Sequence, residues 1–215
     1  MSTNNTLIET QDNKLSLKEI QEAIDDIDKN DNKFCLKTYF EFLENTIKKI
    51  LLRTQSDKLT YDILDTEKSK ANKYIVLKEK QKQMKIGEIW QEVLGNYEGC
   101  VNLKVGHNTG LDIISHTRKF VIELKNRTNT DNASSKKSNF DKLAKFKEEH
   151  PDYICIYANI NDDTEKKTLQ GLNKKIIHNT FEIEYKIGKP FLEFVLGDDT
   201  DSIIEFVKKE IDKYI

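Results

Sequence analysis

Residues 110–125 read GLDIISHTRKFVIELK, two apolar runs joined by a charged turn. Short runs of aliphatic and β-branched residues bounded by polar residues are typical of β-strands, so this stretch predicts a hairpin with strands at 111–115 and 120–125. Three charged side chains lie within the predicted strands: Asp112, Glu123 and Lys125. Burying an isolated charge is costly unless the charge is paired or bound to a metal. The hairpin therefore predicts a polar site whose charges compensate one another.

The Glu-x-Lys spacing at the end of the second strand predicts how these charges meet. Side chains alternate between the two faces of a strand, so Glu123 and Lys125 share one face and Leu124 points to the other. A hairpin partner that carries Asp112 can bring its carboxylate to the same edge. Two converging carboxylates repel each other, and a hard, oxygen-binding cation such as Mg²⁺ relieves the repulsion. We expect Asp112 and Glu123 to bind Mg²⁺, with Lys125 stabilising charge on a phosphate or orienting the attacking hydroxide.

Outward from the hairpin, the sequence alternates between helical and extended patterns. Apolar residues recur at helical spacing over residues 86–94, and Gly95 stands where a helix C-cap is expected. The remaining predicted elements are a strand at 100–105, a polar loop at 126–138, a helix at 139–149, a strand at 153–158 and a closing amphipathic helix at 202–214. This order predicts an α/β layer arrangement.

The N-terminal part of the chain has a different character. Residues 16–54 carry apolar side chains at helical spacing and predict helices. Residues 66–85 are rich in Lys, Glu and Gln, which fits either an exposed helix or a bridge into the next unit. We therefore divide the chain into an N-terminal helical region, residues 1–80, and a core, residues 81–215.

Composition narrows the class of protein. No apolar run approaches the roughly 20 residues that span a bilayer, so no membrane partner is expected. Residues 1–13 have neither the basic start nor the apolar middle of a secretory signal, which predicts a cytoplasmic protein. The three cysteines and four histidines form no spacing typical of a zinc site.

Charge is distributed unevenly along the chain. The formal net charge is only -2, yet residues 118–147 hold nine Lys or Arg against three Asp or Glu, a local net of +6. Such asymmetry favours one surface that faces a polyanion. A charged helix exposed to solvent would explain much of the same pattern.

The order of helix, hairpin, helix and strand, with an Asp before a Glu-x-Lys, resembles the PD-(D/E)XK nuclease superfamily. Leu111 stands where the nominal motif has Pro. Residues 84–161 resemble more specifically the type II restriction endonucleases, in particular the group that cuts at GGNCC. The stretches that carry this resemblance are GHNTGLD at 106–112 and ELKNRTNTDNASSKK at 123–137.

The resemblance implies a restriction-endonuclease-like fold, a mixed central sheet flanked by helices. It also implies Mg²⁺-dependent hydrolysis of double-stranded DNA at a short palindromic site, leaving 5′-phosphates. A two-fold DNA site calls for a two-fold protein, so a homodimer is expected. A companion DNA methyltransferase is expected in the same system but not as a stable complex.

A further catalytic residue is implied in the helix before the hairpin. The string Gly87-Glu88-Ile89-Trp90-Gln91 resembles a superfamily motif of glycine, two residues, an aromatic residue and then Glu or Gln. The match favours Gln91 over Glu88 as a member of the site. Both side chains would otherwise lie on the solvated face opposite Ile89 and Trp90.

Several polar residues around the hairpin are candidates for DNA contacts. Amides, hydroxyls and cations hydrogen-bond base edges and phosphates. The candidates are His107, Asn126, Arg127, Asn129, Asn132, Ser134, Ser135, Lys136 and Lys142. Loops are rich in such residues whatever their function, and lysines on one helix face are commonly only solvated.

Two other functions fit parts of the pattern. The same catalytic core could serve a structure-specific nuclease that repairs DNA or resolves junctions, although the amide-rich stretch favours reading of sequence. A non-catalytic DNA-binding module, in which the charged triplet is an ordinary ion pair, would suit the nearly neutral net charge. The coincidence of Asp112, Glu123 and Lys125 with the order of elements favours the nuclease.

Overall fold

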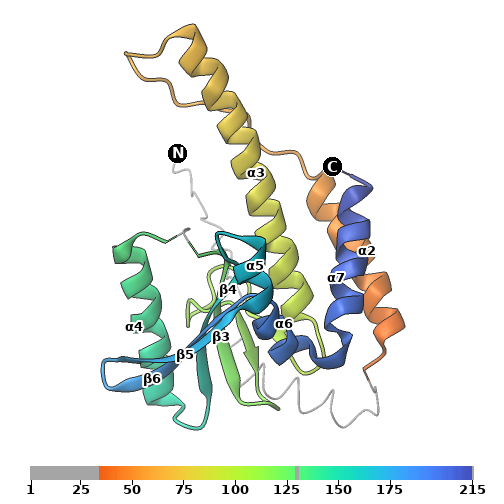
Figure 1. Cartoon of the computed structure of the whole chain (residues 1–215), viewed down its shortest axis with the longest axis vertical. Coiled ribbons are helices and arrows are strands. Elements are labelled where there is room, and N and C mark those ends of the chain that lie inside the picture. The colour runs from red at the N-terminus through yellow and green to blue at the C-terminus, as the bar shows by residue number, and fades with distance from the viewer. Residues whose placement is uncertain (1–33, 129–130, 215) are drawn as a thin grey trace, which may run out of the picture. The chain divides into compact units, whose positions relative to one another are not determined.

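The computed structural model describes residues 34–128 and 131–214, and its centre is a six-stranded sheet of order β1-β2-β3-β4-β6-β5 (Figure 1). The strands are β1 (Val101–Asn102), β2 (Ile113–Ser115), β3 (Phe120–Arg127), β4 (Ile154–Asn161), β5 (Leu172–His178) and β6 (Phe181–Ile187). The pairs β3–β4 and β4–β6 are parallel and the other three are antiparallel. The predicted mixed central sheet is confirmed.

Helices cover both faces of this sheet. They are α2 (Leu36–Leu52), α3 (Glu67–Gly95), α4 (Ala133–Glu149), α5 (Glu165–Gln170), α6 (Lys189–Leu196) and α7 (Thr200–Asp212), with a short 3₁₀ turn η1 (Gly197–Asp199) before α7. Helix α4 lies on one face, and α3 and α6 lie on the other (Figure 1). Helices α2 and α7 pack against one another, α2 also against α3 and α7 also against α6.

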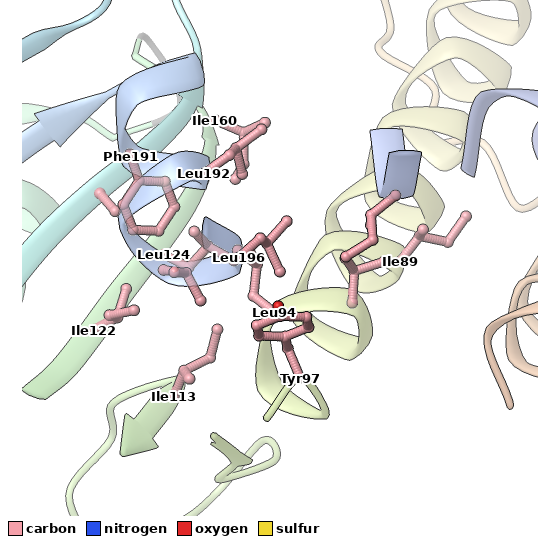
Figure 2. Close-up of a cluster of buried hydrophobic side chains, with 14 of the residues drawn as sticks. Ile89, Leu94, Tyr97, Ile113, Ile122, Leu124, Ile160, Phe191, Leu192 and Leu196 are labelled. Carbon is pink, nitrogen blue, oxygen red and sulfur yellow. The ribbon is translucent and has the colours of Figure 1, made fainter. Parts of the chain in front are cut away.

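The main core lies between the sheet and the helices α3 and α6. Leu124 and Ile122 of β3 point into it, towards Leu94 of α3 and Phe191 of α6 (Figure 2). These side chains are between 0% and 6% exposed. Full burial of such a side chain contributes roughly 1.5–3 kcal/mol, so this face of β3 supplies stability.

Helix α3 connects the core to an exposed segment. It starts with a capping box in which Thr66 accepts from the Ser69 amide and Ser69 accepts from the Thr66 amide. Its first half is largely exposed, whereas Ile89 and Val93 are buried. Residues 66–85 thus form a helix rather than a bridge. The helix crosses position 80 without a break, and the division of the chain at that position stays a prediction.

The predicted C-cap at Gly95 is one residue early, because Gly95 is the last helical residue and Asn96 is the cap. The glycine serves a close approach instead. A Cβ at this position would lie 2.5 Å from the Cβ of Asn102 in β1. The absence of a side chain therefore lets α3 pack directly against the edge of the sheet.

Two predicted segments are shorter in the structure, and two elements were not predicted. The strand predicted at 100–105 is reduced to β1, because Lys104 takes a left-handed φ of 60° and starts a turn. The loop predicted at 126–138 is shorter, because β3 continues to Arg127 and α4 begins at Ala133. Strand β5 and helix α5 were not predicted.

The prediction of N-terminal helices is confirmed for α2, and its part before residue 34 lies outside the described residues. In the range that the structure covers, no helix is long and apolar enough to cross a membrane.

Candidate active site at the β2–β3 hairpin

Asp112 lies directly before β2, opposite Glu123 of β3. Its amide donates to the carbonyl of Ile122 over 3.0 Å, and the next residue, Ile113, pairs with Ile122 in the antiparallel register. Gly110, with a left-handed φ of 63°, turns the chain into this strand. Directly opposed residues of an antiparallel pair share a face, so the two carboxylates lie on the same side of the sheet, as the hairpin predicted.

The Asp112 carboxylate is held from two directions. Its Oδ1 accepts from Nε2 of Gln91 over 2.8 Å, and its Oδ2 accepts from the Leu124 amide over 2.7 Å. Glu88 instead forms a two-pronged ion pair with Arg53, whose shorter branch is 2.5 Å. The structure therefore brings Gln91, and not Glu88, into the site.

Glu123 and Lys125 form an ion pair on the same face of β3. Lys125 Nζ donates to Glu123 Oε1 over 2.6 Å, and the Glu123 side chain is 4% exposed. The second oxygen, Oε2, is buried, and no donor among the described residues reaches it. An unsatisfied buried carboxylate oxygen costs free energy, and a cation bound at Oε2 would offset that cost.

Burial and neighbouring charge both act on this group of residues. Burial, followed by the negative charge of Glu123, raises the pKa of Asp112 from 3.8 to about 6, against the opposing effects of the Leu124 amide, Lys125 and Lys142. For Lys125, burial works to lower the pKa, but the hydrogen bond to Glu123 and the negative charges of Glu123, Asp131 and Asp112 together outweigh burial, so the pKa lies above the ordinary value. A cation between the two carboxylates would stabilise both in their charged form.

The donor set fits Mg²⁺ better than a transition metal. Magnesium prefers oxygen ligands and is held in proteins by one or two carboxylates, with water and substrate phosphates completing its shell. Asp112 and Glu123 offer such a pair, including the unpartnered Oε2 of Glu123. No group of three or more His, Cys, Asp or Glu that could hold a metal occurs in residues 34–128 and 131–214.

Comparison with known proteins places the chain in a family. The model of the Eco47II restriction endonuclease family matches residues 9–209, which is most of the chain. The chain belongs to this family. It is also similar to the type II restriction enzyme Sau96I of Staphylococcus aureus, with 25% identity over 119 residues. That match covers 55% of this chain and 45% of the relative, so the chain spans less than half the length of that enzyme. The resemblance to restriction endonucleases is confirmed.

The residues predicted to contact DNA divide into two groups, and the first lies around the β2–β3 hairpin. Asn126 and Arg127 lie at the end of β3 and line a cavity of about 830 Å³ beside Trp90 of α3. The Asn126 side-chain oxygen accepts from Asn161 over 2.9 Å. His107 lies in the turn before Asp112, where its Nδ1 is 2.9 Å from Oγ1 of Thr109.

The second group gathers at the start of α4. Asn132 is the N-cap and accepts from the Ser135 amide over 2.8 Å, so these residues begin a helix rather than fill a loop. Ser134 and Ser135 are exposed, and the Lys136 ammonium lies 5.0 Å from the ring centroid of Tyr185. Asn129 lies outside the described residues.

Lys142 does not extend into solvent. Its Nζ donates to the carbonyl of Gly110 and to Oδ1 of Asn139, both over 3.2 Å. The ammonium thus lies next to the segment that carries Asp112. A contact with DNA phosphate stays a prediction for this residue.

Three residues beside the site were not predicted from the sequence: Asp131, Asn139 and Tyr157. The first two lie in a stretch where Asn, Asp and Ser are frequent, and Tyr157 was assigned to the core on its apolar spacing. The structure joins all three by hydrogen bonds. The register between β3 and β4 places Tyr157 beside Glu123. Only this long-range pairing reveals that the three residues belong to one cluster beside the site.

Proposed function

We propose that this chain is a type II restriction endonuclease that hydrolyses phosphodiester bonds of double-stranded DNA with Mg²⁺. Asp112, Glu123 and Lys125 are its proposed catalytic residues, with Gln91 in support. The observation that carries the proposal is the convergence of these four side chains, from α3, the segment before β2 and β3, in a member of a restriction endonuclease family.

Each residue has a role that follows from its contacts. Asp112 and Glu123, which lie opposite each other on the hairpin, would hold Mg²⁺ through their carboxylates. When bound, the ion acts as a Lewis acid on the scissile phosphate and lowers the pKa of a coordinated water. Lys125, kept as an ammonium by Glu123, is positioned to stabilise charge that develops on the phosphate oxygens. Gln91 orients Asp112 through its hydrogen bond.

The substrate and products are proposed from the resemblance. The resemblance stated above implies a short palindromic site, with GGNCC as the first candidate, and 5′-phosphate ends. The two DNA-contact groups, at the end of β3 and the start of α4, flank the candidate catalytic residues. They supply amides, hydroxyls and cations of the kind that contact bases and phosphates. Together with His107 before β2 and Lys142 within α4, the proposed contact residues are His107, Asn126, Arg127, Asn129, Asn132, Ser134, Ser135, Lys136 and Lys142.

The assembly is proposed on grounds of symmetry. A palindromic duplex presents the same half-site twice, so two copies of one chain related by a two-fold axis can cut both strands. A companion DNA methyltransferase would protect the host sequence without forming a stable complex with this chain.

The test is digestion of unmethylated phage DNA by the unchanged protein, with Mg²⁺ or with EDTA. Asp112→Ala removes one proposed metal ligand, and Asp198→Ala removes an exposed aspartate of η1 as a matched control. We expect discrete fragments from the unchanged protein and from Asp198→Ala, and none with EDTA or Asp112→Ala. Sequencing of the fragment ends gives the recognition site and the cut position.

Other outcomes separate the alternatives. Intact phage DNA together with cleavage of branched or damaged duplexes would indicate a structure-specific nuclease. Intact DNA of every kind, with Mg²⁺ binding that Asp112→Ala does not change, would reject the nuclease and favour a DNA-binding module.

A further inference from the structure

We propose that four residues on the α4 side of the sheet form a positioning clamp that holds both halves of the candidate active site in place. The residues are Asp131, Asn139, Lys142 and Tyr157, which we call the α4 clamp. The inference rests on the proposed nuclease function and adds to it a set of positioning residues that do not touch the metal or the scissile bond.

One end of the clamp is fixed to the strand next to the catalytic one. Tyr157 of β4 pairs in register with Glu123 of β3, and its ring stacks on Phe140 of α4, so both side chains lie on the face that α4 covers. The Tyr157 hydroxyl donates to Oδ2 of Asp131 over 2.7 Å. Tyr157 is 2% exposed. Asp131, which precedes α4, is thereby fixed to the sheet.

The centre of the clamp is a buried amide. Nδ2 of Asn139 donates to the same Oδ2 of Asp131 over 2.8 Å, and Asn139 is 6% exposed. Asp131 therefore accepts two hydrogen bonds, one from the sheet and one from α4. Because Asn139 lies within α4, this contact fixes the helix relative to the β3–α4 connection.

The other end of the clamp reaches the Asp112 segment. Oδ1 of Asn139 accepts from Nζ of Lys142 over 3.2 Å, and the same Nζ donates to the Gly110 carbonyl over 3.2 Å. Gly110 precedes Asp112 by two residues. The hydrogen-bonded chain thus runs from beside Glu123 to beside Asp112 without using either carboxylate.

The free-energy cost of burying the polar side chains of the clamp argues for a role beyond packing. Buried polar side chains stabilise a fold only when their partners are all in place, and the opposite face of the same strands is filled with apolar side chains. The Asp131 carboxylate also acts by its charge on Lys125. A polar network at this point can fix the relative position of Asp112, Glu123 and Lys125, which catalysis requires to within a fraction of an ångström.

The test compares two substitutions at one position. Asp131→Ala removes both accepted hydrogen bonds, whereas Asp131→Asn keeps an oxygen that can accept them. Asp141→Ala is the matched control, because Asp141 lies on α4 and its carboxylate is 2.6 Å from Nε2 of His178, outside the clamp. For each variant, kcat is measured with Mg²⁺ on a duplex that the unchanged protein cleaves, and the Kd for that duplex is measured in EDTA.

We expect Asp131→Ala to lower kcat by about 10- to 100-fold, the loss typical of a small displacement of catalytic groups, with Kd changed by less than about 3-fold. Asp131→Asn and Asp141→Ala should stay within about 3-fold of the unchanged protein, since the first keeps the clamp and the second lies outside it. Lys142→Ala and Tyr157→Phe should lower kcat in the same way as Asp131→Ala, to a smaller extent.

Three results would overturn the clamp. A normal kcat in Asp131→Ala would show that the network does not position the site. A raised Kd with a normal kcat, in Asp131→Ala or Lys142→Ala, would assign the residue to DNA contact instead. An equal loss in Asp131→Asn and Asp131→Ala would assign the effect to the charge of Asp131 rather than to its hydrogen bonds.

A second measurement keeps the clamp testable if the proposed function fails. Hydrogen exchange, followed by mass spectrometry, reports the amides of Ser135 and Lys136, which donate to Oδ1 and O of Asn132. These amides should exchange faster in Asp131→Ala than in Asp131→Asn, with or without any DNA cleavage. Equal exchange in the two variants would refute the clamp, whereas absence of cleavage by the unchanged protein would refute only the nuclease.

Discussion

Two strands among the described residues carry a Glu-x-Lys sequence, and one of the two lies at the candidate active site. Glu123 and Lys125 of β3 form an ion pair of 2.6 Å, and Glu184 and Lys186 of β6 form an ion pair of 2.8 Å. The spacing, the residue types and the local geometry are the same. Local sequence alone therefore does not distinguish a catalytic pair from a structural one.

The surroundings of the two pairs differ. In the parallel register Glu184 lies beside Ile156, whose side chain points into the main core, and the Lys186 ammonium lies 4.7 Å from the ring centroid of Phe194 in α6. The β3 pair points to the α4 face instead, where Asp112 faces Glu123. A candidate catalytic site thus arises where strand pairing brings a second carboxylate, Asp112, next to the Glu-x-Lys pair. A Glu-x-Lys ion pair without such a second carboxylate contributes to packing.

The largest expected difference between the two pairs is in catalysis. Glu123→Ala should lower the rate of DNA cleavage by at least about 10³-fold, because it removes a proposed metal ligand and frees Lys125. Glu184→Ala should leave the rate within about 3-fold, because it lies outside the site. The measurement is single-turnover cleavage with Mg²⁺, with thermal unfolding as a check on folding. Equal losses in the two variants would remove the distinction between the pairs.

The lysines should differ in the kind of effect. Lys125→Ala should reduce cleavage by about 10²- to 10³-fold, the usual loss for one group that stabilises transition-state charge, with little change in the melting temperature. Lys186→Ala should lower the melting temperature by several degrees, since it strips the partner from Glu184 and the packing from Phe194. Its cleavage rate per folded molecule should be normal. A stability loss without a rate loss in Lys125→Ala would mean that the β3 pair is structural.

The part of the site that the sequence could predict is the part set by local spacing. The positions of Asp112, Glu123 and Lys125 follow from a short hairpin in which strand alternation and register are nearly fixed by apolar side chains. The structure confirms the hairpin and the shared face. Gln91 was reached only through the resemblance, because its contact spans 21 residues.

The remainder depends on contacts between segments far apart in the chain. Tyr157 and Asp131 meet because β4 pairs with β3 in parallel, after α4 has crossed the sheet. No local pattern separates Asp131 from the other polar residues of its stretch. Strand β5 escaped prediction for a related reason: it is an exposed edge strand, and its Lys-rich sequence, LNKKIIH, lacks the apolar alternation of a half-buried strand.

Asp112, the carboxylate that distinguishes the β3 pair from the β6 pair, should also affect the free energy of unfolding. The pKa of Asp112 is raised from 3.8 to about 6 by burial and by Glu123. A raised carboxyl pKa favours the protonated group in the folded state. The stabilisation of the folded state by protonated Asp112 is therefore complete below pH 3.8 and is lost as the pH rises through about 6.

In EDTA, the free energy of unfolding of Asp112→Asn relative to that of the unchanged protein should therefore increase from pH 4 to pH 8, by up to about 3 kcal/mol. The measurement is denaturant unfolding at both pH values. Mg²⁺ at pH 8 should stabilise the unchanged protein and not the variant. If the variant and the unchanged protein differ in free energy of unfolding by the same amount at pH 4 and pH 8, the charge of Asp112 does not destabilise the folded state. Asp198→Asn, at an exposed position, serves as the control.

The smallest expected effect concerns the residue that orients this carboxylate. Gln91 donates to Oδ1 of Asp112, and the Leu124 amide holds Oδ2, so loss of Gln91 leaves Asp112 with one of its two fixed contacts. Gln91→Ala should lower kcat by roughly 3- to 10-fold, below the loss expected for a ligand. The Mg²⁺ concentration needed for half-maximal rate should rise, because a carboxylate that rotates freely binds the ion less well.

Gln83→Ala, on the exposed half of the same helix, should change neither quantity, since its amide pairs only with Glu79 among the described residues. If Gln91→Ala and Gln83→Ala behave alike, Gln91 is a surface residue and α3 contributes only packing to the site. If Gln91→Ala instead matches Asp112→Ala in the size of its loss, the glutamine acts on the reacting groups directly. Only an intermediate loss with a changed Mg²⁺ requirement agrees with an orienting contact that α3 makes to Asp112.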